Sequence, residues 1–196
     1  CGPVGVCAEL VPYLPGPRPV KRADGHYEMN ADLPKSIGRI RSFNGNFGMM
    51  VRAYTYMREL GGAGIQKVSE MAVLNANYLL SLIADTYHVP YGNGRCMHEC
   101  VASDKNFAKE TGVTTLDIAK SLIDCGFHPP TIYFPLVVKG ALMIEPTETE
   151  SRETIEEFAQ ILNDLARKTK EDPESFHRAP ELTRMGRLDE TAAARN

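Results

Sequence analysis

The sequence predicts a mixed α/β domain of the α+β type, in which helices pack on a small, mainly antiparallel sheet. Apolar residues recur at helical spacing through much of the first half, and short strand-like segments dominate after position 86. With 43% apolar residues among 196, the chain is long enough to bury a core. Charged residues make up 24%, close to the globular average, which argues against disorder.

The charge balance excludes some classes of function. Lys and Arg number 22 against 25 Asp and Glu, a formal net charge of −3, whereas binding to nucleic acid requires a basic surface. The longest apolar strand-like run, residues 132–138, is interrupted by Pro135 and is too short to cross a bilayer. We therefore expect neither nucleic acid nor a membrane as a partner.

The first sixty residues combine short elements with many turn residues. Residues 3–11 show helical spacing, and Pro12 is expected to end that helix. A short strand pair is expected within residues 20–33. A further helix, residues 47–60, should stop at the glycine-rich run 61–64, because glycine readily adopts the left-handed conformation.

A longer helix is expected over residues 64–86, and the hydrophobic period changes after it. Four strands are expected in the second half: 87–91, 95–102, 131–138 and 140–145. The first two are joined by Gly92-Asn93-Gly94, which is typical of a hairpin turn. These segments would form the antiparallel sheet.

Two patterns in the second half are typical of capping boxes: Thr114 to Asp117, and Thr147 to Glu150. The first predicts a helix that ends at Asp124, and the second predicts a helix over residues 151–170. From Pro173 onward no period is visible, so this segment is expected to be a mobile or wrapping tail.

The five cysteines are an odd number in a chain with its own core, which argues against a disulfide framework and favours a reducing, cytoplasmic setting. Cys96, His98 and Cys100 alternate along an expected strand, as a zinc site would allow. Alternate strand residues are, however, about 6.6–6.8 Å apart, which is wide for one tetrahedral ion. We therefore expect no metal site, and we expect His98 and Glu99 to point to opposite faces.

Residues 42–48 form a loop rich in glycine and amide side chains, directly before a helix. Free backbone N–H groups at such a position attract phosphate or carboxylate groups. The candidate ligands of an anion are Ser42, Asn44, Gly45 and Asn46. The same composition also occurs in ordinary helix-entry loops, so an anion-binding loop and a purely structural loop both remain possible interpretations.

Three side chains are candidates for lining a substrate cleft: His98, His128 and Thr131. The proline pair 129–130 fixes the local backbone and could aim His128 or Thr131. The alternative is structural, with His98 as a hydrogen-bonded core histidine and residues 126–131 as a rigid turn. The sequence shows no nucleophile–base signature, phosphate-binding P-loop or dinucleotide-binding glycine pattern.

Five separated stretches are similar to one known family: Gly2–Val6, Ser36–Gly48, Ala72–Leu79, Gly126–Thr131 and Met143–Glu148. In this order they resemble the glycine decarboxylase P-protein family. More narrowly, they resemble the C-terminal part of subunit 2 of its bacterial two-subunit form. The resemblance extends over nearly the whole chain.

This resemblance implies the C-terminal portion of an enzyme with the aspartate-aminotransferase-like fold (fold type I), which depends on pyridoxal phosphate. The family decarboxylates glycine and passes the aminomethyl group to the lipoyl arm of the H-protein. Its cofactor lysine precedes the Gly-Pro segment matched by Gly2, so it would lie upstream of Cys1 and no catalytic residue is expected here. The loop residues Ser42, Asn44, Gly45 and Asn46 would then lie near the cofactor phosphate.

The resemblance also implies partners and a domain arrangement. The partners would be P-protein subunit 1, a second copy of the heterodimer, lipoylated H-protein and glycine, in the cytoplasm. Residues 1–35 would continue from a large domain, residues 36–172 would form a C-terminal helix-and-sheet domain, and residues 173–196 a tail.

Because the chain begins with Cys1 rather than methionine, we expect a piece of a longer protein that is inactive alone. Two alternatives remain open: a non-catalytic subunit-assembly domain, and the small domain of another pyridoxal-phosphate enzyme. A lysine just before the glycine-rich run of the longer protein would favour the decarboxylase.

Overall fold

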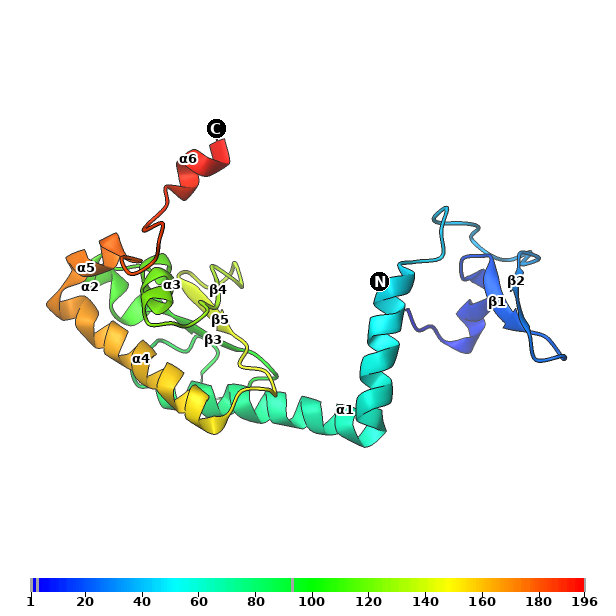
Figure 1. Cartoon of the computed structure of the whole chain (residues 1–196), viewed down its shortest axis with the longest axis horizontal. Helices are drawn as coiled ribbons and strands as arrows, with labels where there is room; N and C mark the ends of the chain where they lie inside the picture. Colours follow the sequence, from blue (N-terminus) through cyan, green and yellow to red (C-terminus); the bar gives the residue numbers. More distant parts are fainter. Residues whose placement is uncertain (1, 3, 93, 196) are drawn as a thin grey trace. The chain divides into compact units, whose positions relative to one another are not determined.

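The computed structural model describes residues 2, 4–92 and 94–195, which form two compact units, Cys1–Gly61 and Gly62–Asn196 (Figure 1). The boundary falls inside the longest helix, α1 (Phe47–Ile83). Gly61 has φ of 64° and ψ of 178°, so it interrupts the helix in a conformation that favours glycine. The predicted break is therefore confirmed at Gly61, whereas Gly62 and Gly64 continue the helix.

The first unit contains a short hairpin besides the start of α1. Strands β1 (Arg18–Lys21) and β2 (Tyr27–Asn30) pair antiparallel, with Arg18 opposite Asn30, which confirms the predicted strand pair. The helix predicted at 3–11 is instead a 3₁₀ helix, η1 (Ala8–Tyr13), that includes Pro12. A short helix of this type tolerates proline because few of its N–H groups are needed.

The second unit contains a three-stranded antiparallel sheet in the order β3-β5-β4, as the predicted fold class requires. Its strands are β3 (Cys100–Ser103), β4 (Thr131–Ile132) and β5 (Ala141–Ile144). All three are shorter than expected. The predicted strand 131–138 ends after two residues, where Tyr133 has a positive φ of 62°.

The predicted strand 87–91 is wrong. Tyr87 completes the last turn of α1 by donating its N–H to the Ile83 carbonyl, and its ring is buried in the core. Only His88 reaches the sheet, through an isolated bridge to Ser103. The expected hairpin turn centred on Asn93 lies outside the described residues.

Six further helices follow α1 in the described part of the second unit. They are η2 (Asp104–Asn106), α2 (Ala108–Thr111), α3 (Thr115–Asp124), α4 (Arg152–Glu171), α5 (Pro173–Arg178) and α6 (Glu190–Arg195). The core joins apolar side chains of α1, α3 and α4 to the inner strands, among them Leu79, Leu122, Leu142 and Leu162. None of the helices in the described part of the chain combines the length and apolar character that a membrane crossing requires.

One of the two predicted capping boxes is confirmed. Thr114 and Asp117 form a capping box at the start of α3. At α4 the capping residue is Ser151, whose hydroxyl oxygen accepts the Thr154 N–H at 3.1 Å, so the Thr147 pattern does not cap this helix. Thr147 has a positive φ of 58°, because the segment before the helix turns sharply there.

The segment after Pro173 wraps onto the second unit. Phe176 of α5 is buried in the core. The guanidinium of Arg187 donates to the Asp117 carboxylate at 2.7 Å and to the Phe176 carbonyl at 3.0 Å. The tail was expected to be either mobile or wrapped onto the domain. As far as Arg187, it is wrapped.

The Asp117 carboxylate receives several hydrogen bonds at the centre of this contact. Burial raises the pKa of Asp117, but the Thr114 backbone N–H, the Thr114 hydroxyl and the Arg187 guanidinium outweigh it and lower the pKa below its usual value. The carboxylate is thus stabilised in its charged form inside the fold, and it joins α3 to the C-terminal segment.

Candidate functional site

Two asparagines of α1 hold the loops that form the candidate site. The side-chain amide of Asn75 donates to the carbonyl oxygens of Thr147 at 2.7 Å and Glu150 at 3.3 Å. The side chain of Asn77 accepts the Cys96 N–H at 3.0 Å and donates to the Cys96 carbonyl at 2.8 Å. These bonds satisfy polar groups within an otherwise apolar helix face. They also fix the loop before β3 and the loop after β5 to one helix.

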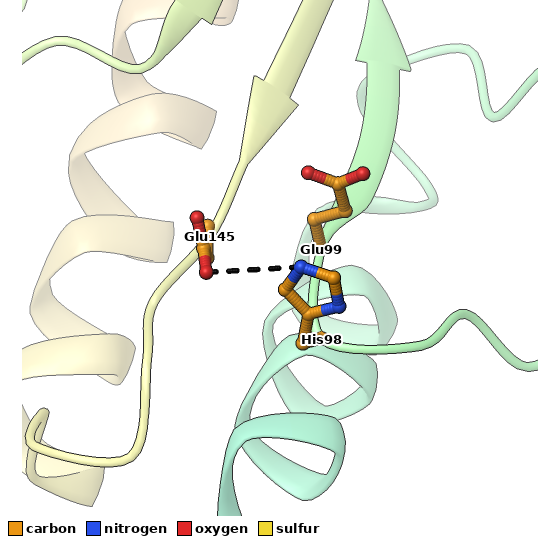
Figure 2. Close-up of side chains that lie close together, drawn as sticks. All are labelled: His98, Glu99 and Glu145. Atoms are coloured by element: carbon orange, nitrogen blue, oxygen red, sulfur yellow. Dashed lines mark ion pairs between the residues drawn. The ribbon is translucent and has the colours of Figure 1, made fainter. Parts of the chain in front are cut away.

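These loops bring His98, Glu99 and Glu145 together (Figure 2). The His98 Nε2 atom lies 3.8 Å from the Glu145 Oε1 atom, and one polar atom of each residue lies within 4.8 Å of the others. The side chains of His98 and Glu145 are 54% and 53% exposed. The expectation that His98 and Glu99 point to opposite faces is wrong, because β3 begins only at Cys100 and the residues before it do not alternate as a strand.

A cavity of about 280 Å³ adjoins this cluster, with Glu145 in its lining. His128 and Glu150 also line the cavity, whose other walls are mostly apolar. The apolar contributors include Leu79, Phe127, Pro130, Ile144 and Phe158. Of the three predicted cleft residues, His128 lines this cavity, whereas His98 lies outside the lining and contacts Glu145. Thr131 is exposed on β4, opposite Met143, and is not part of the cavity lining.

A second cavity of about 1020 Å³ lies elsewhere in the same unit and differs in charge. Its lining includes Lys105, Lys109 and Lys139 as well as Asp104. The cavity beside Glu145 has no Lys or Arg in its lining among the described residues. The two hollows therefore suit ligands of different charge.

The cysteines weighed as zinc ligands have a different environment. Burial raises the pKa of the Cys100 thiol to about 12, and burial also raises the pKa of Cys96. Thiols bind metal ions in their deprotonated form, which these shifts disfavour. Within the described residues, the group close enough to share an ion comprises His98, Glu99 and Glu145, without either cysteine.

The predicted anion-binding loop belongs to the first unit. Its candidate ligands are all exposed: Ser42, Asn44, Gly45 and Asn46. Gly45 has a positive φ of 104°, a backbone conformation that favours glycine. The Asn46 carbonyl accepts the Met50 N–H at 3.2 Å, so α1 begins directly after it. The first turn of α1 carries no acidic side chain that would repel an anion.

Sequence reasoning did not single out Glu145 or Glu150 as site residues. A signal for the site was nevertheless present, since Asn75 and Asn77 are polar residues within an apolar helical stripe. Their partners are backbone groups 72 and 19 residues away, which no local pattern identifies.

Comparisons with known proteins identify close relatives. The family model described as "Glycine dehydrogenase, C-terminal domain" matches residues 68–179. A protein of Desulforamulus reducens named "Probable glycine dehydrogenase (decarboxylating) subunit 2" is 53% identical over 194 residues, which is 99% of this chain and 40% of the relative. A protein of Prosthecochloris aestuarii with the same name is 54% identical over 198 residues, which is again 99% of this chain and 40% of the relative. The chain thus spans about 40% of the length of the curated relatives it matches.

The fold has a counterpart among solved structures. A crystal structure of glycine decarboxylase (P-protein) of the glycine cleavage system, in inhibitor-bound form, superposes with a TM-score of 0.60 at 16% identity. The superposition covers 81% of this chain and 37% of that protein. This likeness confirms the predicted fold, and the family match extends over more than half of the sequence. The chain therefore belongs to the glycine dehydrogenase C-terminal domain family.

Proposed function

We propose that this chain is the C-terminal part of subunit 2 of a glycine decarboxylase, and that it contributes to glycine decarboxylation in the assembled enzyme. The observation that carries the proposal is the 53–54% identity, over 99% of the chain, to proteins named for that subunit. The family model and the fold of a glycine decarboxylase support it independently. A chain that spans about 40% of such a subunit would depend on the remainder for activity.

The relatives' name, subunit 2, supports a partner subunit for this protein. We propose that this partner is P-protein subunit 1, that the heterodimer pairs with a second copy of itself, and that glycine and lipoylated H-protein are the substrates. The aminomethyl group left by decarboxylation would pass to the lipoyl arm. Such an enzyme would act in the cytoplasm, and residues 1–35 would belong with the upstream domain, 36–172 with the C-terminal domain and 173–196 with the tail.

The cofactor proposed for the whole enzyme is pyridoxal phosphate. When bound, this group takes up the electrons released as carbon dioxide leaves glycine. The loop before α1 has donor chemistry that fits its phosphate: the Ser42 hydroxyl, the Asn44 and Asn46 amides, and the free N–H groups of a helix start without acidic neighbours. Gly45 would let the backbone approach closely, because it adopts a positive φ.

His98, His128 and Thr131 are proposed for the substrate side. Glu145 holds the His98 imidazole at 3.8 Å, while His128 contributes to the cavity wall. These groups can orient a small polar substrate and exchange protons with it. The lysine that binds the cofactor covalently would come from the part of subunit 2 that this chain does not include.

The test is Asn46→Ala in the complete two-subunit enzyme. Losing a hydrogen bond to a charged phosphate should cost about 1.5–3 kcal/mol, hence roughly tenfold or more in cofactor affinity. Cofactor affinity is measured by titrating the apoenzyme, and glycine decarboxylation is measured with H-protein present. Asn106→Ala is the matched control, because its exposed amide bonds the Thr86 carbonyl outside this loop.

Unchanged affinity and rate in Asn46→Ala would leave Asn46 as an ordinary helix-entry residue. A wild-type complex that assembles, yet neither binds the cofactor nor releases carbon dioxide from glycine, would favour the non-catalytic assembly domain.

A further inference from the structure

The cavity of about 1020 Å³ in the second unit has three lysines in its lining: Lys105, Lys109 and Lys139. Within the described residues, none of these three takes part in an ion pair, whereas Lys120 and Lys170 are each paired with a carboxylate. Unpaired ammonium groups around one hollow raise the local concentration of anions. The cavity therefore favours a negatively charged ligand.

The single carboxylate in the described lining, that of Asp104, is already engaged with another partner. Asp104 is 8% exposed, and its Oδ2 atom accepts the Thr115 N–H and the Thr115 hydroxyl proton, each at 2.9 Å. Three lysines and one aspartate give the lining a formal charge of +2 when His88 is neutral. A doubly charged anion would balance this charge, and a singly charged anion would balance half of it.

A buried hydroxyl group without a partner borders the same cavity. Ser103 is 1% exposed and is part of the lining, and its Oγ atom has no hydrogen-bond partner among the described residues. Its backbone groups are satisfied, because they exchange hydrogen bonds of 2.9 and 3.3 Å with His88. Cys100 and Ala102 belong to the core, so alternation along β3 directs the Ser103 side chain to the other face of the sheet, which the cavity borders.

Buried hydroxyl groups in folded proteins are almost always hydrogen-bonded. The unpartnered Ser103 Oγ atom is therefore an indication of a ligand that is independent of the lysines.

Apolar side chains complete the wall of the cavity. Tyr133, Leu136 and Val137, from the segment between β4 and β5, line it and are exposed. Covering such surface with an apolar group is favourable, and the volume of the cavity suits a small organic molecule. The ligand that complements this lining combines a negative charge with an apolar body.

We propose that this cavity binds a small organic molecule with a doubly charged oxyanion, either a phosphate monoester or a dicarboxylate. The oxyanion would lie among Lys105, Lys109 and Lys139 and accept the Ser103 hydroxyl proton. The apolar body would lie against Leu136. The proposal does not rest on the proposed function, because the cavity belongs to the second unit, whereas the loop proposed for the cofactor phosphate belongs to the first unit.

The direct test is a titration of the 196-residue chain, whose second unit contains both the cavity and its own core. The probes are phenyl phosphate, the dicarboxylate phthalate and the singly charged benzoate, with binding followed by NMR at pH 7. Two of the three are dianions or nearly so at this pH. We expect saturable binding of a dianion with shifts at Ser103 and Lys105, and at least about tenfold weaker binding of benzoate, as the loss of a charged hydrogen bond predicts.

The comparison of phenyl phosphate with phthalate distinguishes the two sources of the oxyanion, since the tighter of the two identifies the class of ligand. Benzoate binding as tight as that of both dianions would overturn the proposal. Shifts confined to residues 42–46 would also overturn it, because the anion would then bind the loop of the first unit.

Variants of the lining locate the site. Lys105→Gln and Lys139→Gln should each weaken binding of the dianion by about tenfold. Lys67→Gln is the matched control, because Lys67 is exposed in the second unit, has no ion pair among the described residues and is not in the lining. Ser103→Ala should weaken binding several-fold without lowering the melting temperature, since it removes an unpartnered group. Lining variants that bind the dianion as tightly as Lys67→Gln, with unchanged melting curves, would overturn the proposal.

A competition in the complete two-subunit enzyme separates this site from that of the cofactor. The tighter dianion should bind with pyridoxal phosphate in place and should not displace it. Displacement of the cofactor at concentrations that saturate the 196-residue chain would place both in one site and overturn the proposal. A complete enzyme that releases no carbon dioxide from glycine would contradict the proposed function, and the titration of the chain would stand independently.

Discussion

The two units of this chain differ in how far they bury their own apolar side chains. In the second unit, the described core includes sixteen closely packed apolar residues from Leu79 to Phe176. In the first unit, no described residue is buried, and large apolar side chains such as Phe47 and Tyr54 are 77% and 60% exposed. The hairpin and the start of α1 therefore form from local signals without a core to support them.

The charges of the first unit also distinguish it from the second unit. Residues 35–58 contain five basic residues and no acidic one: Lys35, Arg39, Arg41, Arg52 and Arg58. A segment that is basic, apolar and exposed is typical of a surface covered by other protein. The comparison teaches that the second unit has a core that can stabilise it, whereas the described residues of the first unit form none. The predictions below test this difference in order of expected effect.

The largest effect is expected from core truncation in the second unit. Leu142→Ala removes a fully buried side chain of β5 and should lower the free energy of unfolding by about 2–5 kcal/mol. Tyr54→Ala, in the first unit, should change it by no more than about 0.5 kcal/mol in this chain. Urea unfolding measures both. A Tyr54→Ala loss as large as that of Leu142→Ala would contradict the comparison.

The next effect concerns charge. Asp117→Asn should lower the free energy of unfolding at pH 7 by about 1.5–3 kcal/mol, since the carboxylate is 4% exposed and bonded to Arg187. Because the pKa of Asp117 is lowered in the folded state, its stabilisation is complete above the unfolded value of about 3.9 and is lost as the pH falls through the folded value. Urea unfolding from pH 7 to pH 3 should show a larger loss of stability in the wild type than in the variant.

The matched control for Asp117 lies in the first unit. Glu28 pairs with Arg22 at 3.4 Å and is 54% exposed, so Glu28→Gln should change the stability by less than about 1 kcal/mol. Equal losses in Asp117→Asn and Glu28→Gln would show that burial does not distinguish the two units.

The smallest effect concerns helix starts. Ser151→Ala removes the oxygen that accepts the Thr154 N–H and should cost about 1 kcal/mol. Asn46→Ala should leave the stability of this chain unchanged, because the described contacts of Asn46 are made by its backbone carbonyl. Thermal melting compares the two variants. A stability loss in Asn46→Ala would assign that side chain a structural role and weaken its proposed role toward the cofactor.

The sequence predicts those features that depend on neighbouring residues. The capping box at Thr114, the break at Gly61 and the hairpin around residues 20–33 each involve groups only a few positions apart, and each is present. The fold class also follows, because it depends on the order of the periodic segments.

The features that the sequence does not predict depend on distant contacts. Asn77 binds both backbone groups of Cys96, which draws residues 96–99 out of a regular strand and places His98 and Glu99 together. The Asn75 side chain donates a hydrogen bond to the Thr147 carbonyl, and Ser151 rather than Thr147 caps the helix. Hydrogen bonds between a side chain and a remote backbone leave no periodic signal.

The pair of asparagines on α1 makes the spacing of that helix a constraint on how this chain can evolve. Asn75 and Asn77 hold loops on either side of the site from positions two residues apart. One inserted residue between them would rotate one asparagine by about 100° relative to the other and release one loop. Changes in chain length should therefore be tolerated in the loops, and rejected within this single helical turn.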